Sequence, residues 1–333
     1  MKISFVVVAY NEGKTLPRLF ADLCAQDYPH SKIEVLLIDS MSGDNTWALM
    51  EQFSENQNDF ESIKLYKNKN KTLPYGCNIA LENYTGDAIV RIDAHASIPC
   101  DFISKNVQVL KSGEMVSGGQ RPNIIDEDSP WKKTLLAAEQ SMFGSSIASY
   151  RHSTQRRYVS SIFHGMYRRE VYDKAGPYDV RLARTEDNDM SYRIREAGFR
   201  ICYDPNIISY QHTRSTLKTM LRQKYLNGYW IGKTMGISPK CFSLFHFVPF
   251  CFVLGILFTT VLAVFGYPFL AQLMWGAYGL LILVISLLEI CKAPRTLAKL
   301  ALPLLFFLLH VSYGVGTFVG LVEMPVWLRK VKG

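Results

Sequence analysis

The sequence predicts an α/β domain with a mostly parallel central sheet, followed by a C-terminal α-helical membrane domain. In residues 1–239, short β-branched runs alternate with amphipathic stretches, which is typical of strands joined by helical crossovers. Residues 241–288 contain no Asp, Glu, Lys or Arg, and residues 300–322 form a second such stretch. We therefore expect a boundary near residue 239, with the membrane domain in residues 240–333.

The composition excludes several classes of protein. With 48% hydrophobic and 20% charged residues, the chain is neither intrinsically disordered nor collagen-like. Its seven cysteines include no Cys-x-x-Cys pair, so reduced thiols are expected rather than a disulfide or zinc framework. Residues 240–333 hold seven Lys and Arg against two Asp and Glu. This basic excess beside the apolar segments indicates contact with anionic lipid headgroups and not with nucleic acid.

The first part of the chain predicts strands and helices in alternation. Near-continuous apolar runs, typical of central parallel strands covered on both faces, predict strands at 3–9, 34–39, 63–66 and 88–93. Amphipathic stretches between them predict helices at 16–25, 46–53 and 76–82. The run at 3–10 is too short for a signal peptide, so we expect this domain to stay in the cytosol. No phosphate-cradling glycine motif follows the first strand, which argues against a dinucleotide fold or a P-loop.

Polar residues follow these strands at the edge where parallel sheets bind ligands. Tyr10 and Glu12 follow the first strand, Asp39 ends the second, and Asp93 ends the fourth. His95 lies two residues after Asp93, and a carboxylate with an imidazole can hold Mn²⁺ or Mg²⁺ together with substrate phosphates. A turn-capping aspartate beside a surface histidine is the alternative interpretation of the same two residues.

A second acidic cluster is formed by Glu186, Asp187 and Asp189. Three carboxylates within four residues repel one another unless a cation or a proton relieves them. Thr185 can cap a helix that begins here, and acidic residues suit a first helical turn. A helix start that faces a cleft would also present a carboxylate as a general base. The structural and the catalytic interpretations are compatible.

The apolar segments are long enough to cross a membrane, since a span needs about 20 residues at about 1.5 Å each. We expect spans near 244–265, 269–288 and 300–322. The link between the second and third spans holds Lys292, Arg295 and Lys299, which places it in the cytosol. Three crossings would leave Arg329, Lys330 and Lys332 outside, against the same rule. A re-entrant hairpin in the last segment is therefore the alternative to a third crossing.

The motifs taken together resemble glycosyltransferase family 2, inverting enzymes with the GT-A fold. The resemblance rests on four runs in a fixed order, namely 6–12, 38–44, 93–95 and 185–187. More narrowly, the runs 91–96, 165–170 and 210–214 resemble membrane-bound exopolysaccharide glycosyltransferases of the succinoglycan type. The resemblance covers nearly the whole chain. It implies a nucleotide-sugar-binding GT-A domain in residues 1–239, with an acceptor or interfacial segment at about 205–239.

The resemblance also implies roles for single residues. The nucleotide-sugar donor is expected to contact Ala9, Tyr10, Glu12, Asp39, Arg91 and Asp93. Asp93 would hold a divalent metal, Mn²⁺ or Mg²⁺, together with His95, which stands where most of the family has Asp. Asp187 is expected to be the catalytic base, with Glu186 in support. The acceptor or the diphosphate is expected to contact His164, Arg214, Arg222 and Gln223, with a core position as the alternative for His164.

The implied function is a non-processive, inverting, metal-dependent transferase. It would move one sugar from a nucleotide-sugar, a UDP-sugar by resemblance, to an isoprenoid-diphosphate-linked saccharide in exopolysaccharide or capsule assembly. Two alternatives stay open, a polyprenyl-phosphate glycosyltransferase and a non-catalytic, membrane-tethered protein that binds sugar nucleotides.

Overall fold

The computed structural model of the protein describes residues 1–144, 153–213 and 216–332. The chain forms two compact units. The first is made of Met1–Pro122 and Tyr150–His212, and the second of Asn123–Ser149 and Thr213–Gly333. The boundaries between these units do not fall at residue 239, near which the sequence predicts the start of the membrane domain. That membrane boundary stays a prediction.

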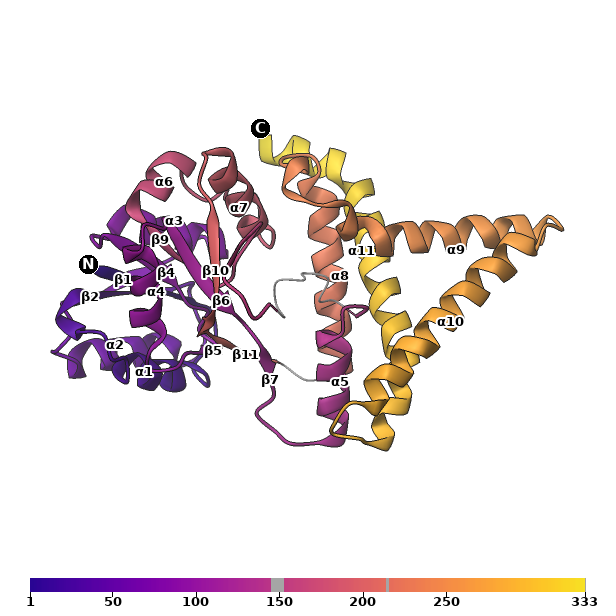
Figure 1. Cartoon of the computed structure of the whole chain (residues 1–333). Coiled ribbons are helices and arrows are strands. Elements are labelled where there is room, and N and C mark those ends of the chain that lie inside the picture. The colour runs from indigo at the N-terminus through magenta and orange to yellow at the C-terminus, as the bar shows by residue number, and fades with distance from the viewer. Residues whose placement is uncertain (145–152, 214–215, 333) are drawn as a thin grey trace. The chain divides into compact units, whose positions relative to one another are not determined.

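The first unit is built on an eight-stranded sheet in the order β3-β2-β1-β4-β9-β6-β10-β8 (Figure 1). β1 pairs in parallel with β2 and β4, and β2 pairs in parallel with β3. β9 runs antiparallel to β4 and β6, while β6 and β10 are parallel. The predicted α/β class with a mostly parallel sheet is therefore confirmed. The strands are β1 (Ile3–Ala9), β2 (Ile33–Asp39), β3 (Ser62–Lys67), β4 (Ala88–Arg91), β6 (Val116–Gln120), β8 (Arg157–Val159), β9 (Met166–Arg168) and β10 (Ile201–Ile208).

Helices cover both faces of this sheet, and two short strands pair beside it. The predicted strand at 88–93 is shorter than expected because residues 93–96 form a turn, closed by the hydrogen bond from the Ala96 N–H to the Asp93 carbonyl oxygen (2.9 Å). The helices are α1 (Leu16–Cys24), α2 (Thr46–Asn56), α3 (Leu73–Asn83), α4 (Phe102–Lys111), α6 (Arg169–Ala175) and α7 (Glu186–Glu196), and the short strands are β5 (Ala96–Ser97) and β11 (Tyr210–His212).

The core explains why β1 carries an unbroken apolar run. Ile3, Phe5 and Val7 pack into the hydrophobic cluster on one face of the sheet, whereas Val6 packs into the cluster on the other face. Successive side chains of a strand point to opposite faces, so a strand with both faces covered needs apolar residues at every position. The first polar residues of this segment therefore come after the carboxyl end of the strand.

The second unit is helical. Three of its segments, Leu244–Val264, Phe269–Cys291 and Leu297–Val331, are long and apolar enough to span a membrane by length and composition. They correspond to the spans expected at 244–265, 269–288 and 300–322, and the third is longer than expected. The elements are β7 (Asn123–Ile124), α5 (Pro130–Gln140), α8 (Leu217–Thr234), α9 (Val248–Val264), α10 (Phe269–Cys291) and α11 (Leu302–Lys332).

The alternative of a hairpin within residues 300–322 is wrong, since α11 is one helix from Leu302 to Lys332. Its glycines serve packing instead of breaking the helix. A Cβ atom at Gly316 would clash with the carbonyl oxygen of Tyr225 in α8, and one at Gly320 would clash with that of Tyr229. Small residues at this spacing let two helix backbones approach closely. α8 and α11 therefore form one closely packed pair.

A side chain introduced into this contact should destabilise the helical unit. We expect Gly320→Val to lower the free energy of unfolding by about 3 kcal/mol, because the Tyr229 backbone cannot move away from the new side chain. Gly279→Val is the matched control, since a Cβ atom at Gly279 meets no atom within 4 Å. Thermal unfolding of the detergent-purified chain measures both. Equal melting temperatures for the two variants would contradict the packing.

Candidate active site

The carboxyl ends of β2 and β3 place a carboxylate beside an ammonium group. Asp39, the last residue of β2, is fully buried, and its Oδ2 lies 3.1 Å from Lys67 Nζ at the end of β3. The Ser42 N–H donates to Asp39 Oδ1 at 3.2 Å, and Lys67 Nζ lies 3.4 Å from the centre of the Trp47 ring. Tyr10 follows β1 with 52% of its surface exposed. The carboxyl ends of β1, β2 and β3 thus offer an exposed aromatic ring (Tyr10), a hydrogen-bond acceptor (Asp39) and a hydrogen-bond donor (Lys67).

The turns after β1 and β2 hold each other in an unusual backbone conformation. Asn11 has φ +55° and Met41 has φ +61°, in the left-handed region that non-glycine residues seldom adopt. The Asn11 side chain accepts a hydrogen bond from the Gly43 N–H (2.8 Å), and the Asn11 N–H donates to Ser42 Oγ (2.9 Å). Strained residues of this kind concentrate at functional sites.

Asp93 is the centre of the second part of the site. Its Oδ1 lies 3.7 Å from Arg91, and its Oδ2 lies 3.8 Å from Arg121 and 3.2 Å from His164 Nε2. Burial opposes ionisation of this carboxyl, but the His164 hydrogen bond and the nearby Arg91 charge hold the pKa of Asp93 well below its usual range. Asp93 is therefore a carboxylate at neutral pH, and 22% of its side chain is open to solvent.

His164 belongs to this cluster. It is buried, its Nδ1 pairs with Ser209 Oγ at 2.9 Å, and burial lowers the pKa of the imidazole. Its φ of +48° is a third left-handed backbone position at the site. The structure thus places His164 against Asp93; contact with an acceptor stays a prediction.

Arg91 links Asp93 to the acidic start of α7. Its guanidinium lies 3.8 Å from Glu186 Oε1 and also donates to Cys77 Sγ at 3.4 Å. Glu186 is buried, and among the described residues its Oε2 has no hydrogen-bond partner. Burial and the adjacent Asp187 charge raise the pKa of Glu186, and burial also raises the pKa of Asp187. Two carboxyl groups with raised pKa values beside a guanidinium suit proton transfer.

The raised pKa of Glu186 predicts a loss of stability as pH rises. The folded chain holds this proton more tightly than the unfolded chain, so the contribution is complete below the ordinary pKa of 4.5 and is lost as pH rises through the folded value. We expect Glu186→Gln to remove at least about 1 kcal/mol of this pH dependence. Thermal unfolding between about pH 5 and pH 9 measures it. The same slope in both proteins would contradict a proton on Glu186.

The second predicted metal ligand, His95, lies beside the carboxyl group of Glu12. His95 Nδ1 lies 3.4 Å from Glu12 Oε1, and Thr15 Oγ1 donates to Glu12 Oε2 at 2.6 Å. Among the described residues, no three His, Cys, Asp or Glu side chains cluster as a ready-made metal site. Ala9 ends β1 and is buried beneath this region. Ligation by His95 stays a prediction.

The remaining candidates lie elsewhere in the sequence. Arg222 and Gln223 are exposed on α8, in the second compact unit. Arg214 lies outside the described residues. Their contacts with an acceptor or a diphosphate stay predictions.

Two basic residues of the site were not anticipated. Lys67 ends β3 and Arg121 directly follows β6. Both stand at the carboxyl ends of strands, where polar residues of a parallel sheet reach the ligand, so the same rule that selects Asp39 and Asp93 could have found them. Cys77 of α3 was also missed, because a single cysteine inside a helix carries no signal.

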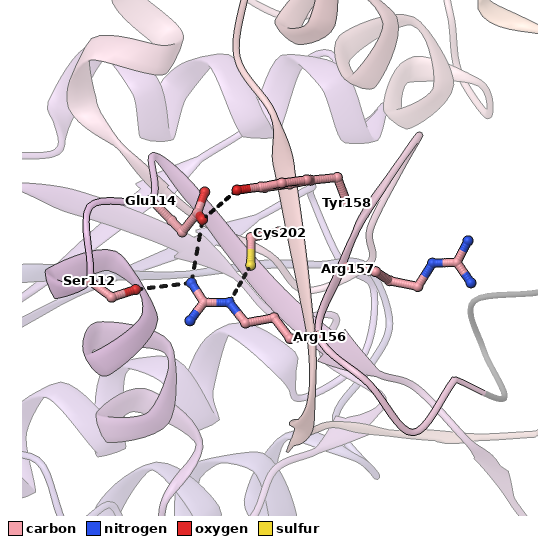
Figure 2. Close-up of a pocket in the computed structure, with 6 residues that line it drawn as sticks. All are labelled: Ser112, Glu114, Arg156, Arg157, Tyr158 and Cys202. Carbon is pink, nitrogen blue, oxygen red and sulfur yellow. Dashed lines mark hydrogen bonds and ion pairs between the residues drawn. The ribbon is translucent and has the colours of Figure 1, made fainter.

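A pocket of about 460 Å³ lies at the opposite edge of the sheet (Figure 2). Ser112 and Glu114 precede β6 and Cys202 lies at the start of β10, so the pocket is at the amino ends of these strands. Five of its six lining side chains pair with one another: Arg156 donates to Ser112 Oγ (2.9 Å) and Cys202 Sγ (3.1 Å), and Tyr158 donates to Glu114 (2.9 Å). None of the predicted site residues lines it.

Comparison with known proteins identifies the family of this chain. A family model described as glycosyl transferase family 2 matches residues 4–176. A transferase of Methanococcus voltae, named dolichyl N-acetyl-alpha-D-glucosaminyl phosphate 3-beta-D-2,3-diacetamido-2,3-dideoxy-beta-D-glucuronosyltransferase, is 25% identical over 329 residues, which are 96% of this chain and 97% of its own. The poly-beta-1,6-N-acetyl-D-glucosamine synthase of Staphylococcus aureus is 25% identical over 225 residues, 67% of this chain and 52% of the synthase.

Solved structures share the fold. The mannosyltransferase PcManGT from Pyrobaculum calidifontis, in complex with GDP-Man and Mn²⁺, aligns with a TM-score of 0.60 at 17% identity, over 95% of this chain and 87% of that one. Residues 1–349 of S. aureus TarS, in complex with UDP-GlcNAc, align with a TM-score of 0.51 at 18% identity, over 69% and 66% of the two chains. With more than half of its residues matched by the family model, the chain belongs to glycosyltransferase family 2, as a GT-A-like enzyme that transfers a sugar from a nucleotide-sugar.

Proposed function

We propose that this enzyme transfers one sugar, with inversion, from a nucleotide-sugar to a lipid-linked saccharide. The observation that carries the proposal is the group formed by Asp93, Arg91 and Glu186, with Asp187 beside it, at the carboxyl ends of the sheet. It combines a stable carboxylate, a cation and a carboxyl group able to accept a proton. A single displacement at an anomeric carbon needs these functions.

The donor would occupy the strand ends. Tyr10 offers a ring for stacking on the base, and Asp39 with Lys67 offers a paired acceptor and donor to its edge. Arg91 and Arg121 flank Asp93 and would neutralise charge on the leaving diphosphate. UDP is the proposed nucleotide. One structural neighbour is in complex with UDP-GlcNAc and another with GDP-Man, so both nucleotides belong in the test.

The residues fit a divalent cation in part. Asp93 is ionised and partly exposed, and Mg²⁺ or Mn²⁺ is often held by one carboxylate together with substrate phosphates. A bound metal would supply Lewis-acid stabilisation of the leaving diphosphate. His95, whose Nδ1 lies 3.4 Å from Glu12 Oε1, would join Asp93 in holding it.

Asp187 is the proposed base. It would take the proton of an acceptor hydroxyl as that oxygen attacks the anomeric carbon, while Glu186, protonated beside it, leaves the negative charge on Asp187. The attack comes from the side opposite the nucleotide, so an α-linked donor gives a β-glycoside.

The proposed acceptor is an isoprenoid-linked saccharide at the membrane surface. The M. voltae relative, which matches almost the whole chain, is named for action on a dolichyl phosphate-linked sugar. The three apolar helices would anchor the enzyme beside such an acceptor, with the catalytic domain in the cytosol. The exopolysaccharide or capsule pathway of the succinoglycan type rests on the motif resemblance alone.

Nucleotide release tests the proposal. The detergent-purified chain is incubated with UDP-, GDP- and dTDP-sugars, with Mn²⁺, Mg²⁺ or EDTA, and with or without a lipid-diphosphate-linked sugar. We expect metal-dependent release with one donor, increased by the lipid-linked acceptor and lost with EDTA. Transfer to bare polyprenyl phosphate would identify a polyprenyl-phosphate glycosyltransferase instead. Donor binding without release would contradict a catalytic role for this chain alone.

A further inference from the structure

α8 packs along the part of α11 that was expected to cross the membrane. Gly228 of α8 lies against Tyr313 and Thr317 of α11, and Gly232 lies against Thr317 and Leu321. In these contacts the residue numbers increase together in both helices, so α8 and α11 run parallel and lie side by side. Any membrane depth assigned to this half of α11 therefore applies to α8 as well.

α8 is too polar for the hydrocarbon core. It carries four basic residues, and the side chains of Lys218, Arg222 and Gln223 are exposed. A charged side chain in hydrocarbon is costly unless it reaches headgroups or water. Because the glycine contacts hold α8 against α11, the cost cannot be avoided by separating the two helices. A membrane-crossing α11 would carry this polar surface into the bilayer.

The side of α11 opposite α8 is apolar and exposed along its length. The exposed side chains are those of Leu304, Val315, Phe318, Val322 and Val326. At about 100° per residue they fall within one narrow sector of the helix, which we name the α11 stripe, and they extend over about 33 Å. An apolar stripe on one side and a basic surface on the other is typical of a helix lying in the membrane interface.

α9 and α10 are the other two apolar helices of this unit. They form an antiparallel hairpin in which Phe252 stacks on Tyr278, with ring centres 4.3 Å apart, and its tip lies away from α11 (Figure 1). The tip is apolar, with Val264, Phe265 and Phe269 exposed. Exposed apolar side chains on both helices and at the tip suit insertion into hydrocarbon.

The backbone of the hairpin tip is also suited to a dry environment. The Gly266 N–H donates to the Ala263 carbonyl (3.1 Å), and the Tyr267 N–H donates to the Leu262 carbonyl (2.9 Å). Pro268 has no N–H to satisfy. Unpaired backbone groups are costly in lipid, so these internal bonds reduce the cost of carrying the turn into or across the bilayer.

We infer that only the α9–α10 hairpin inserts into the hydrocarbon core, and that α11 lies in the interface of a lipid leaflet with the α11 stripe on the acyl chains. The chain after α11 then stays on the same side as the link between α10 and α11. That topology groups Arg329 and Lys330 with Lys292 and Arg295, all exposed, beside the anionic headgroups of one leaflet. The inference is independent of the sugar and the acceptor.

Sidedness is tested on the unaltered full chain with one fused reporter at its C-terminus. Green fluorescent protein fluoresces in the cytosol, and bacterial alkaline phosphatase becomes active only after export. We expect fluorescence from the first fusion and no phosphatase activity from the second, with the same result when each reporter is placed before Met1. Active phosphatase at the C-terminus alone would establish a third crossing and overturn the inference.

Depth is tested in vesicles of zwitterionic and anionic phospholipids. Nitroxide labels are placed one at a time at Leu304→Cys, Val315→Cys and Val326→Cys, with the exposed Cys100, Cys251 and Cys291 replaced by serine. An interfacial helix gives the same shallow depth at all three positions. A crossing helix places residue 315 about 15 Å deeper than the other two and would overturn the inference. Because both readouts are independent of turnover, failure of the proposed enzymatic function would leave them interpretable.

Discussion

Asp187→Asn is expected to reduce acceptor-dependent nucleotide release by about 10²-fold or more. The substitution keeps the shape of the side chain and the hydrogen bond from the Asn188 N–H to its Oδ1 (2.8 Å), but it removes the atom that would take the proton. Binding of the donor should be unchanged, because the base acts on the acceptor hydroxyl. Single-turnover release and donor titration measure the two effects separately.

Asp189→Asn is the matched control, since it removes one negative charge from the same helical turn. Asp189 accepts a hydrogen bond from Arg193 Nε at 2.9 Å, a contact that stabilises α7. We expect this variant to lose thermal stability and to keep its rate of transfer. Near-normal turnover in Asp187→Asn, or equal losses in both variants, would contradict Asp187 as the base.

Asp93→Asn is expected to lower transfer by about 10²-fold or more and to weaken activation by Mn²⁺. The carboxylate lies within reach of three groups that favour its charge, Arg91 (3.7 Å), Arg121 (3.8 Å) and His164 (3.2 Å). Its loss leaves these groups without their shared partner and removes the expected metal ligand. Initial rates measured across a metal titration should show a lower maximum and a higher half-saturating metal concentration.

Asp101→Asn is the control for this second variant. Asp101 forms a surface ion pair with Lys105 at 2.7 Å, one helical turn apart at the start of α4. Exposed pairs of this kind contribute little to stability, so we expect an unchanged metal titration. If Asp93→Asn also kept the metal dependence of the unaltered enzyme, the metal would have to be held by other residues.

The sequence alone predicts those site residues that stand at the carboxyl end of a strand. Asp39 and Asp93 follow apolar runs, and the carboxyl ends of parallel strands meet at one edge, so their neighbourhood followed from the pattern. The partners of these residues did not follow from it. Arg121 and His164 reach Asp93 from positions 28 and 71 residues further along the chain, and local periodicity contains no information on such contacts.

The membrane segments were likewise only partly predictable from the sequence. Length and apolar composition predicted three helices, and the structure contains them. The sequence could not show that Gly316 and Gly320 bind α11 to a basic helix, because a glycine in an apolar run is equally compatible with a break. The inferred interfacial position of α11 therefore rests on its packing against α8, although the composition of α11 alone favours a crossing.

The sequence by itself determined the α/β class, the order of the first strands, the strand-end carboxylates and the apolar helices, because each depends on local periodicity or on residues adjacent in the chain. Only the tertiary structure decided that Arg91 lies between Asp93 and Glu186, that Glu186 is buried beside Asp187, and that α8 covers one side of α11. These features depend on contacts between distant segments. Their charge and burial set the pKa values on which the proposed chemistry depends, and the packing of α8 is the basis for the inferred membrane depth of α11.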